Sequence, residues 1–404
     1  MKVRLNREKI EYLVVFIAVL GMGSLYFQVL HMPLMAVMEV VAAGILLLGD
    51  FNISKRNFVG YFTITLFFLL TSIVNLKNGF YVNDLIIWCV NAFFIIVMQS
   101  HMTFESFKQK FVRIMVLEAI VSLICFFWAD MLGNSLPLMF ISRNAANGYY
   151  MTPYFTLGWY NIPVFHRNAG MYNEPGAHQI FLNFALLFLL SDNDYLGLTK
   201  KKYTLSLLIL IIAVLTTQST TGYMCLLIVF TAVIMKKTEG KKNTKLKIAV
   251  IIAIAILAFI ESLTGVVETK LSGISTGQGS GLTRFNDTYY GYFIALSKPL
   301  LGHGVFMANQ KEILNAYGII NISNGMASFA IRAGIVFVAI FLIMIYNGMK
   351  KKLPYGIFFN LCAFLLFLLC INSEGVFMNL LFLSMLGEWK MGGGMALQQD
   401  KKNY

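Results

Sequence analysis

The residues best suited to chemistry are concentrated in one short stretch that precedes an apolar segment. Residues 166–178 read HRNAGMYNEPGAH and supply one Arg, one Glu, two His and two Asn. Charged side chains are costly near a lipid bilayer, and in membrane proteins they usually mark a functional site. Arg167 and Glu174 flank the start of the apolar segment, so both are candidate catalytic residues. Gly170 and Gly176 give the backbone freedom to approach a ligand.

An ordinary helix start accounts for part of this stretch. Asn173 is a typical N-cap residue, and an acid followed by Pro175 suits the first turn of a helix. That interpretation leaves Arg167 and His178 unexplained, so we favour a functional site. We expect Asn173 and His178 to contact a substrate, and Arg167 to act in catalysis and in binding an anion.

Other arginines extend this candidate site, because a guanidinium group is a planar fork of donors suited to phosphate. Arg332 lies within an apolar segment, where a cation should face a polar cavity or a partner rather than lipid. Arg284 precedes Asp287 in an amphipathic segment, and a surface arginine paired with that aspartate is an equal alternative. Arg143 is a further candidate for binding phosphate.

Three other polar positions have two interpretations each. His303 lies between two glycines, as a free imidazole or as a plain turn residue. Ser219 and Thr220 belong to the polar corner 218–222 and either contact pyrophosphate or sugar, or cap a helix. Glu39 and Glu118 lie within apolar segments, where they form a proton relay or pair with polar neighbours.

The composition predicts a helical protein embedded in a membrane. The 404 residues are 58% hydrophobic and 13% charged, with a mean hydropathy of +0.71. A soluble domain of this size needs far more surface charge. Apolar runs long enough to cross a hydrocarbon core of about 30 Å predict about 12 transmembrane helices. They are expected at residues 12–30, 33–49, 58–76, 82–99, 110–129, 176–190, 203–217, 221–235, 247–264, 326–347, 353–372 and 375–388.

The basic residues predict the orientation of these spans. With the N-terminus inside the cell, the cytoplasmic segments contain three quarters of the 32 Lys and Arg residues. This bias is typical of a multi-pass protein with both termini in the cytoplasm. It also explains the net charge of +13 without nucleic acid. Residues 1–404 therefore form one membrane domain with two large extracytoplasmic loops, at 130–175 and 265–325, the second with an interfacial helix over 282–298.

Several function classes are excluded by what the sequence lacks. It contains no Walker A motif, no HExxH pair and no paired acids in the outer loops. A nucleotide-driven motor is not expected, and neither is a bound metal.

A series of motifs in the second half resembles a known family. They are an Arg-x-x-Gly-x-x-Asn-x-Pro-like entry at 167–175, the Ser/Thr-rich corner 218–222, Arg284 with a helix after it, the PLLGHG turn at 299–304, and an Asn-x-x-x-Ser-like entry at 324–335. Together they resemble the O-antigen and capsular polysaccharide repeat-unit polymerases (Wzy type) and the related O-antigen ligases. The Glu-Pro-Gly version is similar to the capsule and exopolysaccharide members. The resemblance covers roughly residues 130–390.

This resemblance implies a bacterial cytoplasmic membrane protein of the glycosyltransferase-C-like class, without cofactor or metal. The implied reaction transfers a growing glycan from undecaprenyl pyrophosphate to the sugar of an incoming lipid-linked repeat unit. A flippase and a chain-length regulator of the same pathway are the implied protein partners. One departure stands out: Ser219-Thr220 replaces the Ser-Arg of many members, so one expected cation is absent.

Roles for the candidate residues follow from that reaction. Arg143, Arg167, Arg284 and Arg332 would hold the pyrophosphate leaving group from separate parts of the chain. Glu174 or His303 would accept the proton of the attacking hydroxyl. Tyr289 and Tyr290 would pack against sugar faces. The alternatives are an O-antigen ligase, and a flippase or transporter of lipid-linked oligosaccharide, although a transporter predicts internal repeats that the sequence does not show.

Overall fold

The chain folds into a bundle of apolar helices. The computed structural model describes residues 7–27, 31–49, 52–128, 142–144, 149–151, 155–157, 167–191, 195–238, 280–319, 322–376 and 378–391. Within these ranges the α-helices are α1 (Arg7–Gly23), α2 (Met32–Gly49), α3 (Lys55–Val74), α4 (Val82–His101), α5 (Phe104–Phe127), α7 (Pro175–Ser191), α8 (Lys200–Thr216), α9 (Thr220–Thr238), α12 (Ser280–Leu296), α13 (Gln310–Asn315), α14 (Gly325–Ala333), α15 (Ile335–Lys352), α16 (Ile357–Ser373) and α17 (Leu380–Leu383).

Two short 3-10 helices and three short strands complete the described elements. The 3-10 helices are η2 (Leu76–Asn78) and η5 (Tyr195–Gly197). The strands are β1 (Ser142–Asn144), β2 (Tyr149–Met151) and β3 (Thr156–Leu157), which pair antiparallel in the order β1-β2-β3. They lie in the predicted first outer loop, so that loop adds a small sheet to a chain expected to be all-α.

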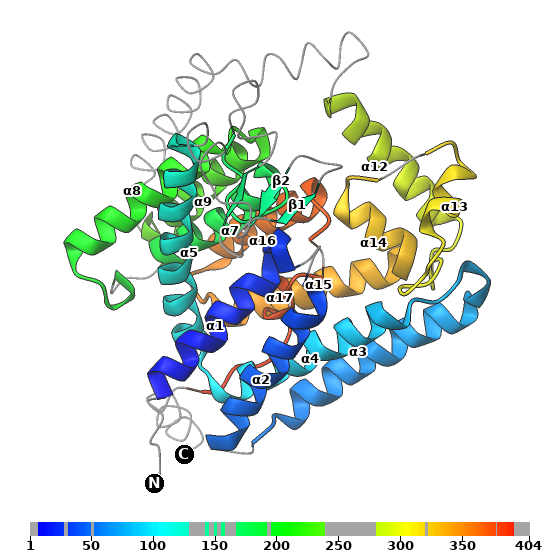
Figure 1. Ribbon diagram of the computed structural model, residues 1–404, viewed down its shortest axis with the longest axis horizontal. Coiled ribbons are helices and arrows are strands. Elements are labelled where there is room, and N and C mark those ends of the chain that lie inside the picture. Colours follow the sequence, from blue (N-terminus) through cyan, green and yellow to red (C-terminus); the bar gives the residue numbers. More distant parts are fainter. Residues whose placement is uncertain are drawn as a thin grey trace.

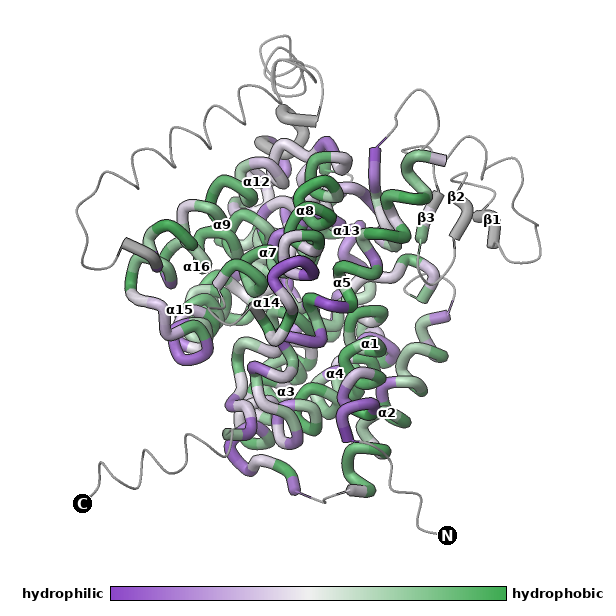
Figure 2. Tube along the Cα trace, turned by 90° about the vertical axis from the view of Figure 1, so that its left-hand side faces the viewer, coloured by the Kyte–Doolittle hydropathy of each residue, from purple (hydrophilic) through white to green (hydrophobic). Residues whose placement is uncertain are grey.

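Within the described ranges, three helices, α2, α3 and α4, are long and apolar enough to cross a membrane. Shorter apolar helices include α7 and α16. Figure 2 shows hydrophobic residues along most of the length of the helices. A predominantly helical protein with candidate membrane spans is therefore confirmed among the described residues, whereas twelve spans are not. The predicted ninth span, 247–264, lies outside the described residues.

The predicted tenth span is two helices rather than one. Gly334, with φ +90°, separates α14 from α15. A Cβ at this position would lie 2.7 Å from the carbonyl oxygens of Pro299 and Leu300. The backbone N–H of Val336 also donates to Pro299 O at 3.1 Å. The loop after α12 thus inserts at the break, which hydropathy does not reveal.

The predicted twelfth span, 375–388, is wrong as a helix, because only the four residues of α17 are helical there. Irregular backbone is tolerated at membrane depth only where the protein satisfies its polar groups or where it lines a cavity. Here Tyr61 Oη donates to Leu383 O at 2.6 Å and Gln99 Nε2 donates to Ser384 O at 3.0 Å. Lys352 Nζ donates to Met385 O at 2.7 Å. Other helices therefore supply the hydrogen bonds that this segment lacks.

Helix α1 lies between α2 and α5 and packs against both (Figure 1). Helix α7 packs against α5, α8 and α9, and α9 packs against α16. Helix α12 packs against α14. Helix α7 is the most completely buried of these, since its residues from Ile180 to Leu189 are all buried. The central position of α7 fixes its N-terminus, where the candidate site begins.

Basic residues gather at one end of the bundle, which we call the basic end. Lys108 of α5 and Lys236 of α9 both contact Tyr355, which precedes α16: Lys108 Nζ lies 3.3 Å from its hydroxyl and Lys236 Nζ 4.0 Å from its ring centroid. Lys110 Nζ lies 3.0 Å from Glu11 Oε2. Burial raises the pKa of Glu11, but hydrogen bonds from Ser106 and Lys110 and the charge of Lys110 outweigh burial and lower it.

Candidate functional site

The stretch before α7 is held in place by an asparagine and a glycine. The Asn168 side chain donates to Ser122 Oγ at 3.2 Å and to Thr216 Oγ1 at 3.0 Å. Its carbonyl oxygen accepts from the backbone N–H of Gly170 at 3.0 Å. Gly170 has φ +57°, and a Cβ there would lie 2.3 Å from Glu118 Oε1. Only glycine combines this conformation with so close an approach to α5.

A buried histidine and glutamate fasten the same stretch to α5. His178 Nε2 and Glu118 Oε2 are 2.9 Å apart, and Glu118 Oε1 accepts from the backbone N–H of Met171 at 3.3 Å. The Tyr172 ring stacks on the imidazole at a centroid distance of 5.3 Å. His178 is 0% exposed, so it supports the stretch from the buried side, where it contacts α5. Of the two roles expected for Glu118, the structure thus shows pairing with a polar neighbour.

Arg167 joins this stretch to the corner between α8 and α9. Its Nε donates to Thr217 O at 3.0 Å, and its Nη2 donates to Gln218 O at 3.1 Å. These carbonyls follow the last residue of α8, where a helix leaves its acceptors unsatisfied and carries partial negative charge. The guanidinium group therefore caps α8 with two of its five donors. Ser219 lies beside it, buried, with Oγ accepting from Gly222 N at 3.2 Å.

The N-termini of α7, α9 and α14 border one region at the end opposite the basic end. A Cβ at Gly176, in the first turn of α7, would lie 2.0 Å from Glu374 Oε1. A Cβ at Gly325, the first residue of α14, would lie 2.0 Å from Glu374 O. A Cβ at Gly222, in the first turn of α9, would lie 3.0 Å from Gln179 Cβ of α7. These contacts place all three N-termini around Glu374 and the first turn of α7.

We call this group the polar cluster; it consists of Arg167, Asn173, Glu174, Ser219, Thr220, Asn324 and Glu374. Helix N-termini carry partial positive charge, which favours anions. Ser219 Oγ already accepts from Gly222 N in α9, and Asn324 Oδ1 accepts from Ala327 N in α14. Glu174 directly precedes α7 and is partly exposed, whereas Glu374 is 6% exposed. The cluster can therefore bind an anionic group and also offers two carboxylates as proton acceptors.

Helix α12 packs against α14 (Figure 1), and α14 begins beside Asn324 of the polar cluster. Asp287 Oδ2 accepts from Ser323 N at 2.9 Å and from Ser323 Oγ at 2.6 Å. Asn324 Nδ2 donates to Thr288 Oγ1 at 3.0 Å. Arg284 is one helical turn before Thr288, and its side chain lies outside the described residues. The predicted amphipathic helix over 282–298 is confirmed.

The remaining candidates lie in other places. Tyr289 and Tyr290 of α12 are exposed, and their rings meet edge to face at a centroid distance of 5.3 Å. The side chain of Arg143, in β1, lies outside the described residues. Neither tyrosine makes a described contact that binds it to the polar cluster, so their predicted contact with sugars stays a prediction.

Arg332 and His303 lie near the opposite end of α14. Arg332 Nε donates to Gln310 Oε1 at 3.1 Å and Nη2 donates to the same oxygen at 2.5 Å. His303 N donates to Ile331 O at 2.8 Å, and His303 Nε2 lies 3.2 Å from Ser297 Oγ. Since a helix rises 1.5 Å per residue, about 10 Å along α14 separates Arg332 from the polar cluster.

The sequence suggested that Arg167 and Arg332 converge on one site. In the described residues no network of contacts joins them. Burial lowers the pKa of His303, and the charge of Lys298 lowers it further. Lys298, which donates to Asn75 Oδ1, makes this second region cationic as well. Arg332 and Lys298 thus lie at the end of α14 opposite the polar cluster.

Sequence reasoning did not select Glu374, Asn324 or Gln179 for the site. A Glu between Ser373 and Gly375 directly after an apolar run was the available signal for the first. Among the described residues, no group of three or more His, Cys, Asp or Glu side chains is placed to hold a metal ion.

Comparisons with family models and with curated proteins found no match to this sequence.

Proposed function

We propose that the protein is a membrane-embedded glycosyltransferase that polymerises lipid-linked oligosaccharide repeat units. In the proposed reaction a glycan moves from undecaprenyl pyrophosphate to a hydroxyl of the incoming repeat unit, in the biosynthesis of a capsular polysaccharide, exopolysaccharide or O-antigen. The new bond joins the acceptor oxygen to the anomeric carbon. The bond from that carbon to the diphosphate breaks, and the diphosphate leaves on its lipid.

The observation that supports this proposal is the polar cluster, where three helix N-termini, Arg167 and two carboxylates adjoin. The N-termini and Arg167 would stabilise the charge that develops on the leaving diphosphate. Arg284 would add a second guanidinium group from α12. Arg332 and His303, at the far end of α14, are assigned no direct contact with this diphosphate.

We assign the proton acceptor to Glu174, which is partly exposed at the start of α7. Its carboxylate would take the proton of the acceptor hydroxyl as the new glycosidic bond forms. Glu374 is the second candidate, because it lies against the same first turn. Asn173, Ser219 and Thr220 would contact the sugars or the diphosphate from the edge of the cluster.

The proposed setting is the bacterial cytoplasmic membrane, with both termini in the cytoplasm. The basic end would then face the cytoplasm, as the excess of lysine there favours. The polar cluster would face the opposite side, where a flipped lipid-linked repeat unit arrives. A flippase and a chain-length regulator of the same pathway are the proposed partners.

Deletion of the gene, followed by size analysis of the surface glycan, tests this proposal. Loss of long polymer with retention of single repeat units supports it. Loss of all exported lipid-linked units would indicate a flippase instead. Accumulation of long, untransferred polymer on its lipid would indicate a ligase.

Complementation with Arg167→Lys and Glu174→Gln tests the polar cluster itself. Both variant proteins should be present in the membrane at the wild-type level, but neither should restore the long polymer. Glu312→Gln, a change of an exposed carboxylate on α13, is the matched control and should restore it. Normal polymer length in both cluster variants would remove the site assignment.

A further inference from the structure

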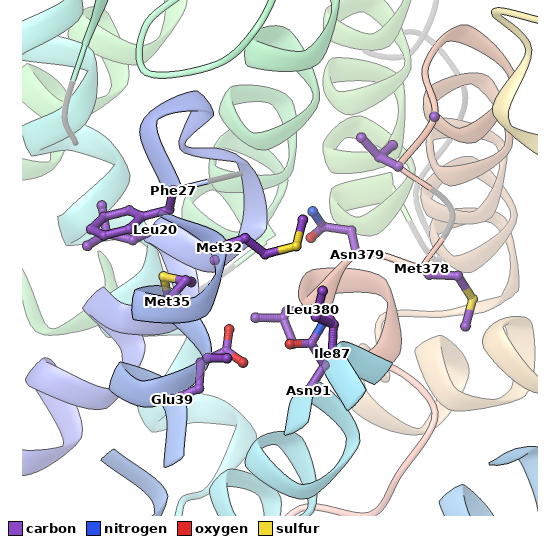
Figure 3. Close-up of a pocket in the computed structure, with 14 residues that line it drawn as sticks. Leu20, Phe27, Met32, Met35, Glu39, Ile87, Asn91, Met378, Asn379 and Leu380 are labelled. Carbon is purple, nitrogen blue, oxygen red and sulfur yellow. The ribbon is translucent and has the colours of Figure 1, made fainter. Parts of the chain in front are cut away.

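A second polar site lies in a cavity between α1, α2, α4 and the irregular segment around α17. Its volume is about 260 Å³, and none of its described lining residues belongs to the polar cluster. The residues that line it are Leu20, Gly21, Phe27, Met32, Met35, Ala36, Glu39, Ile87, Asn91, Gly375, Val376, Met378, Asn379 and Leu380. Among the described residues of this lining, Glu39 is the one ionisable side chain. Figure 3 shows Glu39 and Asn91 extending into the cavity from α2 and α4.

Glu39 lies on the buried face of α2. It shares that face with Met35, Ala42 and Leu46, whereas Val37 and Val40 are exposed on the other side. The glutamate is 2% exposed and starts about 10 Å along the helix from Met32, at 1.5 Å per residue. A side chain at this depth cannot reach the bilayer surface along its own helix.

The carboxyl group has no described partner. Among the residues that the structure describes, no hydrogen bond or ion pair forms with the side chain of Glu39 or with that of Asn91. The other amide in the cavity, Asn379, is already engaged, since it donates to Met22 O and accepts from Leu381 N at 3.0 Å. An ionised carboxylate without a counter-charge is costly at membrane depth, so this group either keeps its proton or holds a cation.

The charged groups near the cavity do not supply that counter-charge. On α4, Asp84 lies about two turns before Asn91 and is itself acidic. Glu374 adjoins the lining segment, but its carboxylate lies against Gly176. Helix α1 contributes Gly21, where a Cβ would lie 2.6 Å from Glu39 Oε1. Glycine at this position thus keeps α1 close while leaving room for the carboxylate.

The donor set restricts the ion. A single carboxylate neutralises an ion of single charge but leaves a divalent ion with a net positive charge in a buried site, which is costly. Calcium sites accordingly use several carboxylates. The lining contains neither His nor Cys, which zinc prefers. A soft ion would need the methionine sulfurs together, but Figure 3 shows the thioethers of Met32, Met35 and Met378 apart from one another. Non-helical backbone next to such a cavity, here Gly375 and Val376, is typical of sodium sites in membrane proteins.

We propose that this cavity binds a small alkali cation, with Glu39 as its charged ligand and Asn91 as a neutral one. When the cation enters, the proton of the carboxyl group leaves to solvent, so that net charge in the cavity is unchanged. Protons therefore compete with the ion. Cation binding at this cavity does not depend on the proposed glycan transfer.

Thermal unfolding of the purified full-length protein tests the proposal, with Na⁺ as the probe. Sodium chloride should raise the melting temperature in a saturable way, and choline chloride at equal ionic strength should not. Each tenfold rise in proton concentration should weaken the apparent sodium affinity by up to tenfold over the range in which the carboxyl group titrates.

Variants separate binding at this cavity from a general salt effect. Glu39→Gln should lose the sodium response, and Asn91→Ala should weaken the apparent affinity at least tenfold. Glu312→Gln on the exposed face of α13 should keep the wild-type response. A response shared by choline, or retained in Glu39→Gln, would overturn the proposal. If Glu39→Gln fails to fold, release of about one proton per wild-type chain on addition of sodium decides the matter, and no release contradicts the site.

Discussion

The hydrogen bonds of Glu118 give the sharpest prediction for stability. Its carboxylate accepts from His178 at 2.9 Å and from the backbone N–H of Met171 at 3.3 Å. Glu118→Ala removes both acceptor oxygens and leaves two buried nitrogens without partners. Each buried N–H group left without an acceptor costs about 1–3 kcal/mol. Glu118→Gln keeps the shape of the side chain and one of its two acceptor oxygens, so it should lower the free energy of unfolding by only about 1 kcal/mol.

Denaturant unfolding in detergent micelles measures this difference. Hydrogen exchange at residues 167–174 should also accelerate in Glu118→Ala, because this stretch loses its attachment to α5. The exposed Glu312 of α13 provides the control, and Glu312→Ala should change stability by less than about 0.5 kcal/mol. Equal unfolding midpoints for the two alanine variants would show that the Glu118 pair does not hold the stretch.

Three further predictions concern the polar cluster and its surroundings. Arg167→Lys should lower transferase activity at least tenfold, because lysine cannot bridge two carbonyls while facing an anion. Gly176→Ala should also lower transferase activity about tenfold, because the added Cβ displaces the carboxylate of Glu374. The control is Gly44→Ala, whose Cβ meets no atom; it should stabilise the folded protein by about 0.5–1 kcal/mol and leave activity normal. The lowered pKa of His303 means that stability is full above pH 6.5 and falls as the pH drops below that value, and thermal unfolding of His303→Gln should lack this step.

The helices could be predicted well from the sequence. The apolar runs indicated α2, α4 and α7 to within one or two residues at each end, because lipid and core both require continuous apolar faces. The amphipathic pattern likewise indicated α12. These features depend on neighbouring residues, so composition and periodicity suffice to find them.

Two of the differences from the predicted spans arose from contacts between distant segments. Gly334 ends α14 because the Pro299 loop inserts there, and the segment around α17 stays irregular because α3, α4 and α15 satisfy its carbonyls. Both sequences are apolar enough for a continuous helix. Hydropathy alone therefore favoured a helix that the tertiary hydrogen bonds replace.

The candidate site was predicted only in part for the same reason. The residue types directed attention to the stretch before α7, whose role as a site stays a prediction, but the spacing did not show that His178 would face Glu118. It also did not show that Arg332 would bind Gln310 at the far end of α14. The contacts of Glu374 with Gly176 and Gly325 join residues about 50 to 200 positions apart, which a single sequence does not encode locally.

Reconstitution of the purified protein in lipid vesicles tests the central proposal most directly. The measurement is the size distribution of glycan formed from an undecaprenyl-pyrophosphate-linked repeat unit, together with the lipid diphosphate released. We expect a ladder of polymer with one lipid diphosphate released per new linkage, and no ladder with Arg167→Lys. Unchanged single repeat units with the wild-type protein, or an equal ladder with the variant, would contradict this account.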